Sequence, residues 1–409
     1  MRLSRRTLLG SAAAIGSAAT LPLLPVRAQT PSIKIGVLTD MSGPYQDIAG
    51  PGSVAATNQA AAEFMAANPG IKVEVVSADH QNKADIGVGV ARQWFDRDGV
   101  DVILDVANSA VALAVSGVAK EKNKVLMATG AATSDLTGKS CNANTVHWVY
   151  DTYMLAKSTG GAIVKTGGDS WFFVTADYAF GHALERDVGE FVKAAGGKVL
   201  GAVRTPFPGT TDFSAFLLQA QASGAKVLGM SNAGADTINT IKQAKEFGIK
   251  MRLAGLLVFI SDVHSLGLDV CQGLTLSESF YWDLNDATRA FSQRVASRIP
   301  GKRPTMVQAG NYACVVHYLK AVKEAGAAPA KADGAAMIAR MKAMPTDDDC
   351  FGKGSIREDG RKIHPSYLFE VKKPAESKGA WDYYKLLATT PADEAFRPLG
   401  TGGCTLVKA

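Results

Sequence analysis

The stretch VDVILDVANSAVALAV (residues 100–115) contains the change of pattern on which the fold prediction depends. Its first part, residues 100–106, is an apolar run typical of a strand buried in a parallel sheet. From Ser109 to Asn123 the apolar residues recur at the spacing of a helix. The sequence therefore predicts a buried strand that leads through a short polar turn into a helix.

The same alternation of strand and helix extends over two consecutive segments of the chain. In the first segment we expect strands at 33–40, 72–79, 100–106 and 124–130, with helices at 52–68, 85–98 and 109–123. In the second segment we expect strands at 170–177, 198–207, 225–232 and 251–259, with helices at 181–197, 212–224 and 235–248. Such strands pair in parallel through right-handed crossovers, so the predicted fold class is α/β, with one unit used twice.

The later part of the chain is expected to complete both units. It contains predicted helices at 285–299, 304–325 and 333–343, and antiparallel-looking strands within 355–373 and 380–389. We expect two lobes, one of residues 33–150 plus about 283–347 and one of residues 152–280 plus about 348–390, followed by a tail at 391–409. Two lobes joined by several chain crossings would enclose a cleft.

The first 28 residues have the pattern of an export signal. Arginines come first, an apolar run begins at Leu8, and Val26-Arg27-Ala28 provides a small-residue cleavage site. The stretch SRRTLL (residues 4–9) also resembles a twin-arginine signal. The apolar run is too short and too interrupted for a membrane anchor. We therefore expect cleavage after about Ala28 and a periplasmic location.

The charge of the chain gives no indication of a polyanionic partner. Four arginines and no acid lie in the expected leader, so much of the formal net charge of +6 belongs to it. Nothing in the remaining balance suggests nucleic acid or an anionic membrane as a partner. A chain of 409 residues is also too long for one ordinary core, which agrees with two lobes.

The five cysteines are widely spaced, which argues against zinc and redox motifs. Export makes disulfides chemically feasible. Cys141 and Cys404 lie in loops rich in small residues and are the favoured pair, and Cys271 with Cys350 is the alternative. Cys314 lies in a helical pattern and is expected to be a small buried hydrophobic residue.

The loops that follow the strands are where a ligand is expected, because ligands of open parallel sheets bind outside the carboxyl ends of the strands. These loops are rich in Ser, Thr, Asn, Gly and aromatic residues, and poor in arranged acids and bases. They cover residues 39–47, 78–82, 106–111, 129–135, 175–181, 205–213, 231–236 and 256–262.

Ser109 and Thr133 both fall near the start of a helix or turn. A nucleophilic Ser109 would need an elbow motif and a base, and the sequence has neither around it. None of the six histidines has the spacing of a metal site, and no nucleotide-binding motif is present. The two hydroxyls are therefore either plain helix caps or, with neighbouring N–H groups, an anchor for a ligand carboxylate.

Aromatic residues are frequent at strand ends and connections. Each one alone is compatible with ordinary packing, but the group favours a cleft with flat apolar walls for a small organic ligand. The group consists of Tyr45, Tyr150, Tyr153, Tyr178, Phe180, Phe259, Phe280, Tyr281 and Trp282.

The ordered motifs IKIGVLTDMSGPY, VANSAV, KVLMATGAATSDLTG, TADYAFG and PTMVQAGNYA resemble a known family. They are similar to those of type I periplasmic solute-binding proteins of the hydrophobic and branched-chain amino-acid ABC transport systems. The resemblance covers the chain after the leader. It implies two Rossmann-like lobes with parallel sheets, joined by a hinge of several crossings that closes on a ligand. It also implies delivery to a membrane permease with its ATPase, no cofactor, no enzymatic activity and, most simply, a monomer.

The resemblance also implies which residues contact the ligand. Asn108 and Ser109, with the backbone N–H of Ala131 and with Thr133, would hold a carboxylate. It further implies contacts from Tyr45, from Phe180 or Tyr178, and from Asn232. Candidates for ligand contact beyond the resemblance are Asp151, Tyr153, Leu257 and Tyr281.

One departure from the family pattern affects the ligand class. Amino-acid binders are expected to place an acid in the loop that here reads GLLVF (residues 255–259). A buried ammonium group without a counter-charge is costly, and Asp151 or Glu278 would have to replace the acid. We therefore expect a small aromatic carboxylate, such as a benzoate- or cinnamate-like acid. Branched-chain amino acids or amides, with Asp151 neutralising the amine, are the alternative.

Two other functions are less favoured on sequence grounds. A sensory receptor would present its ligand to a signalling partner, and the sequence contains no kinase or transmembrane segment for that purpose. An exported hydrolase would depend on the nucleophilic Ser109 for which no base was found.

Overall fold

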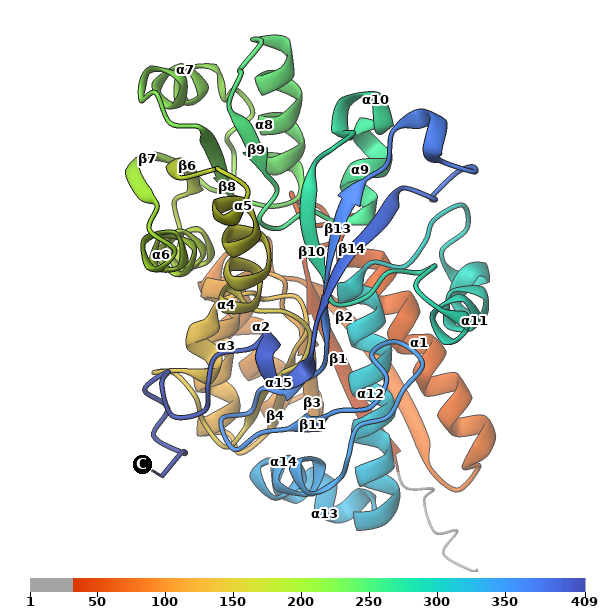
Figure 1. Cartoon of the computed structure of the whole chain (residues 1–409). Helices are drawn as coiled ribbons and strands as arrows, with labels where there is room; N and C mark the ends of the chain where they lie inside the picture. The colour runs from red at the N-terminus through yellow and green to blue at the C-terminus, as the bar shows by residue number, and fades with distance from the viewer. Residues whose placement is uncertain (1–31, 409) are drawn as a thin grey trace, which may run out of the picture. The chain divides into compact units, whose positions relative to one another are not determined.

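The computed structural model describes residues 32–408, so the expected export signal lies outside the described residues. The first sheet has five parallel strands in the order β2 (Lys72–Asp79), β1 (Ser32–Thr39), β3 (Val102–Asp105), β4 (Val125–Ala128) and β5 (Thr145–His147). The helices that connect its strands are α1 (Gly50–Ala67), α2 (Ala84–Asp96) and α3 (Ser109–Glu121). We call this sheet with its helices the first lobe (Figure 1).

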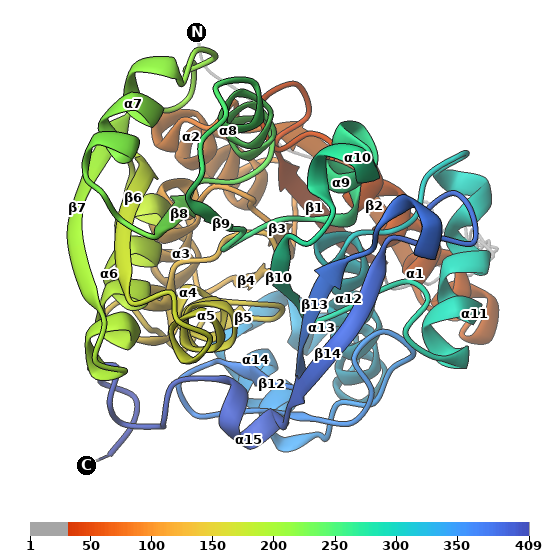
Figure 2. The same cartoon turned by 45° about the horizontal axis from the view of Figure 1, so that its top comes forward.

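The second sheet has seven strands. Their order is β7 (Lys198–Thr205), β6 (Ser170–Ala176), β8 (Val227–Ser231), β9 (Arg252–Ala254), β10 (Thr275–Glu278), β13 (Ser366–Val371) and β14 (Tyr384–Thr390), as Figure 2 shows. The strands from β7 to β10 pair in parallel, and β13 and β14 pair antiparallel. The helices of this second lobe are α6 (Ala179–Ala194), α7 (Ser214–Ala222), α8 (Ala235–Glu246), α9 (Ile260–Leu266) and α10 (Leu268–Cys271).

The chain passes between the two sheets after β5, after β10 and again before β13. The first passage contains α4 (Thr152–Leu155), a π turn (Ala156–Gly160) and α5 (Gly161–Lys165). The second leads to α11 (Asp286–Val295), a short 3-10 turn (Ala296–Arg298) and α12 (Met306–Ala325), and α12 packs on α1. After α12 come α13 (Ala327–Ala332), α14 (Gly334–Ala343), β11 (Ser355–Ile356) and β12 (Lys362–Ile363). Late segments therefore pack on the first lobe and supply β13 and β14 to the second.

The core positions follow from the apolar runs identified in the sequence. All four residues of β3 and of β4 are buried, as expected for strands covered on both faces. None of the helices within residues 32–408 is long and apolar enough to cross a membrane. The core and the expected strand–helix alternation thus form one consistent α/β arrangement.

The strand expected at residues 251–259 is wrong in its second half. The strand β9 ends at Ala254, residues 256–259 form a buried loop, and α9 begins at Ile260. A short apolar run does not distinguish a strand from a buried loop by its periodicity. Leu257 lines a cavity, whereas Leu256, Val258 and Phe259 pack in the hydrophobic core.

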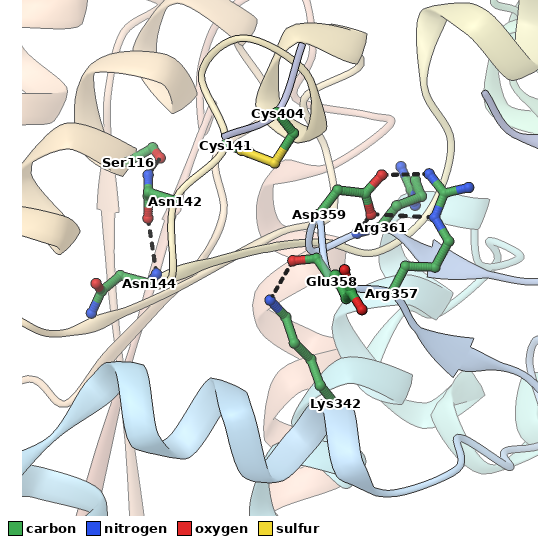
Figure 3. The surroundings of a disulfide bond; sticks show 10 residues. All are labelled: Ser116, Cys141, Asn142, Asn144, Lys342, Arg357, Glu358, Asp359, Arg361 and Cys404. Atoms are coloured by element: carbon green, nitrogen blue, oxygen red, sulfur yellow. Dashed lines mark hydrogen bonds and ion pairs between the residues drawn. A yellow bond between two sulfur atoms is a disulfide. The ribbon is translucent and has the colours of Figure 1, made fainter. Parts of the chain in front are cut away.

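A disulfide joins Cys141 to Cys404, the favoured pair of the sequence analysis (Figure 3). The alternative pair is not formed, because Cys271 and Cys350 are free buried thiols, as is Cys314. The bond attaches the C-terminal segment that follows α15 (Ala392–Ala395) to the loop after a 3-10 turn of the first lobe (Ser134–Thr137).

Candidate functional site

A small cavity lies among the loops at the carboxyl ends of strands from both sheets. The first lobe contributes the loops after β1, β3 and β4, the second contributes those after β6, β8 and β9, and Tyr150 comes from the passage after β5. No charged side chain is among the lining residues, which are Tyr45, Ile48, Ala107, Ser109, Gly130, Ala132, Tyr150, Tyr178, Phe180, Ala233 and Leu257.

The polar side of the cavity is the start of α3. The side chain of Asn108 caps this helix by accepting the N–H groups of Ala110 and Val111 at 2.9 and 3.1 Å. Capping fixes the first turn of the helix, so its partly positive N-terminal end lies at the cavity. Ser109, the first residue of α3, lines the cavity directly.

Ser109 also connects α3 to the loop after β4. Its hydroxyl oxygen accepts the N–H groups of Ala132 and Thr133 at 3.3 and 3.2 Å. The hydroxyl of Thr133 caps the following 3-10 turn by accepting the N–H of Asp135. The carbonyl of Ala131 lies 2.7 Å from Nε2 of His147. Ser109 is therefore hydrogen-bonded to the loop of residues 130–134, which also contains Ala131 and Thr133. We call residues 130–134 the anchor loop.

The apolar side of the cavity is aromatic and comes from both lobes. The hydroxyl oxygens of Tyr45 and Tyr178 are 2.5 Å apart, and Phe207 stacks on both rings with centroid distances of 5.4 and 4.3 Å. Tyr150 donates its hydroxyl to the carbonyl of Gly130 at 2.7 Å. The rings of Tyr45, Tyr178 and Phe207, which come from both lobes, therefore connect the lobes at this side of the cavity.

Gly234 permits a second close contact between the lobes. Its φ is +59°, and a Cβ atom built on it would lie 2.3 Å from the carbonyl oxygen of Pro44. The same carbonyl accepts the N–H of Ala235 at 3.1 Å. A side chain at position 234 would push the lobes apart, so glycine is required for this approach.

The second lobe contains an acid near the cavity that the sequence analysis missed. Asp236 lies in the first turn of α8 and is 3% exposed, and within residues 32–408 its Oδ2 atom has no hydrogen-bond partner. Loss of water around the carboxyl raises its pKa from 3.8 to about 7. Burial makes the largest contribution to the raised pKa of Tyr178, and the negative charge of Asp236 raises this pKa further. The absence of an acid at residues 255–259 therefore did not mean that the second lobe lacks one.

Asp151 and Glu278, the acids considered from sequence, have structural partners. Asp151 caps α4 by accepting the N–H of Met154 at 2.8 Å, and its Oδ2 lies 3.5 Å from the guanidinium of Arg361. Glu278 accepts the hydroxyl proton of Tyr384 at 2.9 Å. Neither acid lines the cavity.

Three further candidates lie away from the cavity lining. The amide of Asn232 is bonded to the hydroxyls of Thr237 and Thr240, which makes it part of the loop before α8. Tyr153 packs edge-on against Phe191. Tyr281 belongs to the core of the second lobe and donates its hydroxyl to the carbonyl of Trp381.

The structure thus brings Tyr45, Ser109, Tyr178, Phe180 and Leu257 together in the lining, with Asn108, Ala131 and Thr133 directly behind it. Tyr150 had been noted only as one of many aromatic residues. Phe207 was not among the candidates, although its loop (residues 205–213) was among those expected to bind a ligand. The expected strand extended to residue 207, whereas β7 ends at Thr205. Within residues 32–408, no cluster of three His, Cys, Asp or Glu side chains could hold a metal ion.

The comparisons with known proteins agree on one family. A family model described as "Periplasmic binding protein" matches residues 32–380. The chain is similar to the crystal structure of a periplasmic binding protein from Burkholderia mallei, with 52% identity, a TM-score of 0.89, and coverage of 92% of this chain and 100% of that one.

Two relatives carry more specific names. A branched chain amino acid ABC transporter periplasmic ligand-binding protein from Burkholderia xenovorans is 40% identical, with a TM-score of 0.79 and coverage of 91% of this chain and 99% of that one. A Leu/Ile/Val-binding protein homolog 6 from Brucella melitensis is 27% identical over 274 residues, which are 64% of this chain and 68% of that protein.

Proposed function

Because the chain belongs to the type I periplasmic binding proteins of ABC transporters, we propose that it captures a small aromatic carboxylate between its two lobes. Proteins of this family bind a solute and pass it to a membrane permease, and they are not enzymes. The proposal therefore concerns the ligand and the residues that hold it. The observation that carries it is the pairing of a polar helix start with aromatic walls in one cavity.

The start of α3 and the anchor loop are suited to a carboxylate. Ser109 accepts two backbone N–H groups, so its own proton remains available as a donor. The end of the helix adds the partial positive charge that favours anions at such positions. We assign the carboxylate of the ligand to this side of the cavity.

The other walls are suited to a flat apolar body. Tyr45, Tyr150, Tyr178 and Phe180 surround the cavity together with Leu257. Aromatic rings bind a ring of the ligand by stacked or edge-to-face contacts at low entropic cost. Because no charged side chain lines the cavity, an uncharged ring is the group that these walls accommodate best.

An apolar amino acid is the second candidate, and Asp236 is the observation that favours it. A buried carboxyl with an unpaired oxygen beside a binding cavity could compensate a ligand ammonium group. Two of the relatives are also named for branched-chain amino acids. The two candidates share the carboxylate and differ only in whether an amine faces Asp236.

Calorimetric titration of the chain without its first 28 residues tests the proposal. We expect benzoate or cinnamate to bind more tightly than leucine, valine or phenylalanine. Tight binding of leucine or valine, with no binding of either aromatic acid, would overturn it. Asp236→Asn separates the candidates, since an aromatic acid should bind this variant as well as the wild type, whereas an amino acid should lose most of its affinity.

A further inference from the structure

The part of the C-terminal tail that follows α15 (residues 396–408) lies outside both sheets and is attached to the first lobe at two points. Cys404 is bonded to Cys141, as Figure 3 shows. Close to the bond, a Cβ atom on Gly138 would lie 2.7 Å from the carbonyl of Gly402, so the backbones approach closely. The tail is therefore held against the segment that directly follows the anchor loop.

This attachment places Arg397 at a junction of the lobes. One Nη2 atom of Arg397 donates to the hydroxyl of Ser134 at 2.8 Å and lies 3.8 Å from the carboxylate of Asp187. The guanidinium also lies over the ring of Tyr153, 5.4 Å from its centroid. The guanidinium of Arg357 donates to the backbone carbonyl of Arg397 at 2.7 Å and fixes the tail at the same point.

Asp187 connects this arginine to the second lobe. It belongs to α6 and is 1% exposed. Its Oδ2 atom accepts the hydroxyl protons of Ser134 and Thr152 at 2.8 and 2.6 Å, and its Oδ1 atom accepts from Nε of Arg186. Buried charged groups need such complete partnering, so removal of one partner disturbs the others.

Ser134 is the last residue of the anchor loop. Its N–H donates to the hydroxyl of Thr152, and the preceding N–H, that of Thr133, donates to Ser109. The anchor loop thus contacts Ser109, the proposed hydrogen-bond donor to the ligand carboxylate, through Thr133. Through Ser134 it contacts Asp187 and Arg397. A shift of Ser134 would move the N–H groups that orient Ser109.

We propose that Arg397 is a positioning residue for the carboxylate anchor, and that the Cys141–Cys404 disulfide keeps it in place. The inference rests on the proposed function, because the anchor loop is the part of the site assigned to the ligand carboxylate. Arg397 does not touch the ligand itself. It fixes the loop by donating to the hydroxyl of Ser134, which also accepts from Nη2 of Arg186 at 3.0 Å. Its guanidinium adds a second positive charge near Asp187, whose first cationic partner is Arg186.

The first test is the affinity for benzoate, measured by calorimetry and stopped-flow. We expect Arg397→Ala to lower the affinity about tenfold, which corresponds to the loss of one charged hydrogen bond, mainly through faster dissociation. Arg397→Lys should recover part of the loss, since an ammonium can still reach Ser134. Arg340→Ala, which removes an exposed arginine paired with Glu324, should leave the affinity unchanged.

The double variant Cys141→Ser/Cys404→Ser releases the tail while keeping Arg397. It should lower the affinity in the same direction, and adding Arg397→Ala to it should have little further effect, because both changes act on one arrangement. Full additivity, or unchanged affinity in both variants, would overturn the proposal. The double variant also serves as the test if Arg397→Ala fails to fold.

A second measurement does not depend on the ligand. Amide hydrogen exchange at residues 131–137 of the ligand-free protein should be faster in Arg397→Ala than in wild type and unchanged in Arg340→Ala. Faster exchange with no benzoate binding to the wild type would support the positioning role and contradict the proposed ligand. Unchanged exchange would overturn the positioning role whatever the ligand.

Discussion

The hydroxyl oxygen of Ser109 accepts two backbone N–H groups, which leaves its proton free to donate into the cavity. Ser109→Ala should therefore weaken benzoate binding about 10- to 100-fold, the usual contribution of a hydrogen bond to a charged group. Ser116→Ala is the matched control, because this serine lies on the same helix and bonds to Thr145 and Asn142 rather than to the anchor loop. Calorimetry should show a loss for Ser109→Ala alone, and equal affinity in both variants would contradict the assignment.

Asp236 makes the stability of the protein depend on pH. Its pKa rises to about 7 on folding because burial removes water, so the folded state binds this proton more tightly than the unfolded state does. The free energy of unfolding should therefore fall as pH rises from about 4 to about 7. In Asp236→Asn, the fall in the free energy of unfolding between pH 5 and pH 8 should be smaller by about 2 kcal/mol.

Urea denaturation at several pH values measures this effect. Asp105 and Asp262, whose pKa values burial also raises to about 6 and about 7, keep part of the pH dependence in the variant. An identical pH profile for wild type and Asp236→Asn would show that Asp236 is not the unpaired buried acid described above.

At the scale of elements, the cap of α3 serves both stability and binding. Asn108→Ala removes the acceptor for two N–H groups of the first turn and should cost about 1 kcal/mol of stability. The same change should weaken benzoate binding, because Ser109 directly follows the cap. Asn285→Ala removes a similar cap from α11 and should cost similar stability without changing affinity. Denaturation and calorimetry on both variants separate the two effects.

The elements themselves follow from local sequence patterns to different degrees. The bounds of β3, β4 and α3 lie within two residues of those expected, because their apolar spacing is unambiguous. The run 251–259 is predicted as a strand throughout, although its second half is a buried loop. Its apolar residues pack in the core, and Leu257 lines the cavity, so their spacing does not distinguish a strand from such a loop.

At the scale of the whole molecule, the two lobes meet through aromatic contacts. Phe207 stacks on Tyr178 within its own lobe and on Tyr45 of the other lobe. Phe207→Ala should therefore raise the dissociation rate of benzoate about tenfold, since two ring contacts are lost. Association should change less, because affinity differences among variants of one site lie mostly in the dissociation rate.

Stopped-flow displacement measures this rate directly. Phe216→Ala provides the control, because Phe216 packs against Phe213 on α7 rather than against Tyr45 or Tyr178. If both variants released benzoate at the rate of the wild type, the three-ring stack would have no part in closure.

The candidate site was predictable where a local pattern reported it. Ser109 and Thr133 stand at starts of helices or turns, and Tyr45 and Tyr178 stand in loops after strands, so sequence position alone marked them. Asp236 was missed because an acid in the first turn of a helix is ordinary; burial and its unpaired oxygen distinguish it. Both are properties of the folded chain.

The sequence by itself determined the alternation of strands and helices and the loops available for binding, because apolar periodicity is a local property. Tertiary structure alone decided which of those loops meet. Tyr45 and Tyr178 are 133 residues apart and share a 2.5 Å contact, and Arg397 donates to the hydroxyl of Ser134, which lies 263 residues earlier in the chain. Such meetings depend on how two sheets and their crossings pack together, and no local pattern of residues encodes that packing.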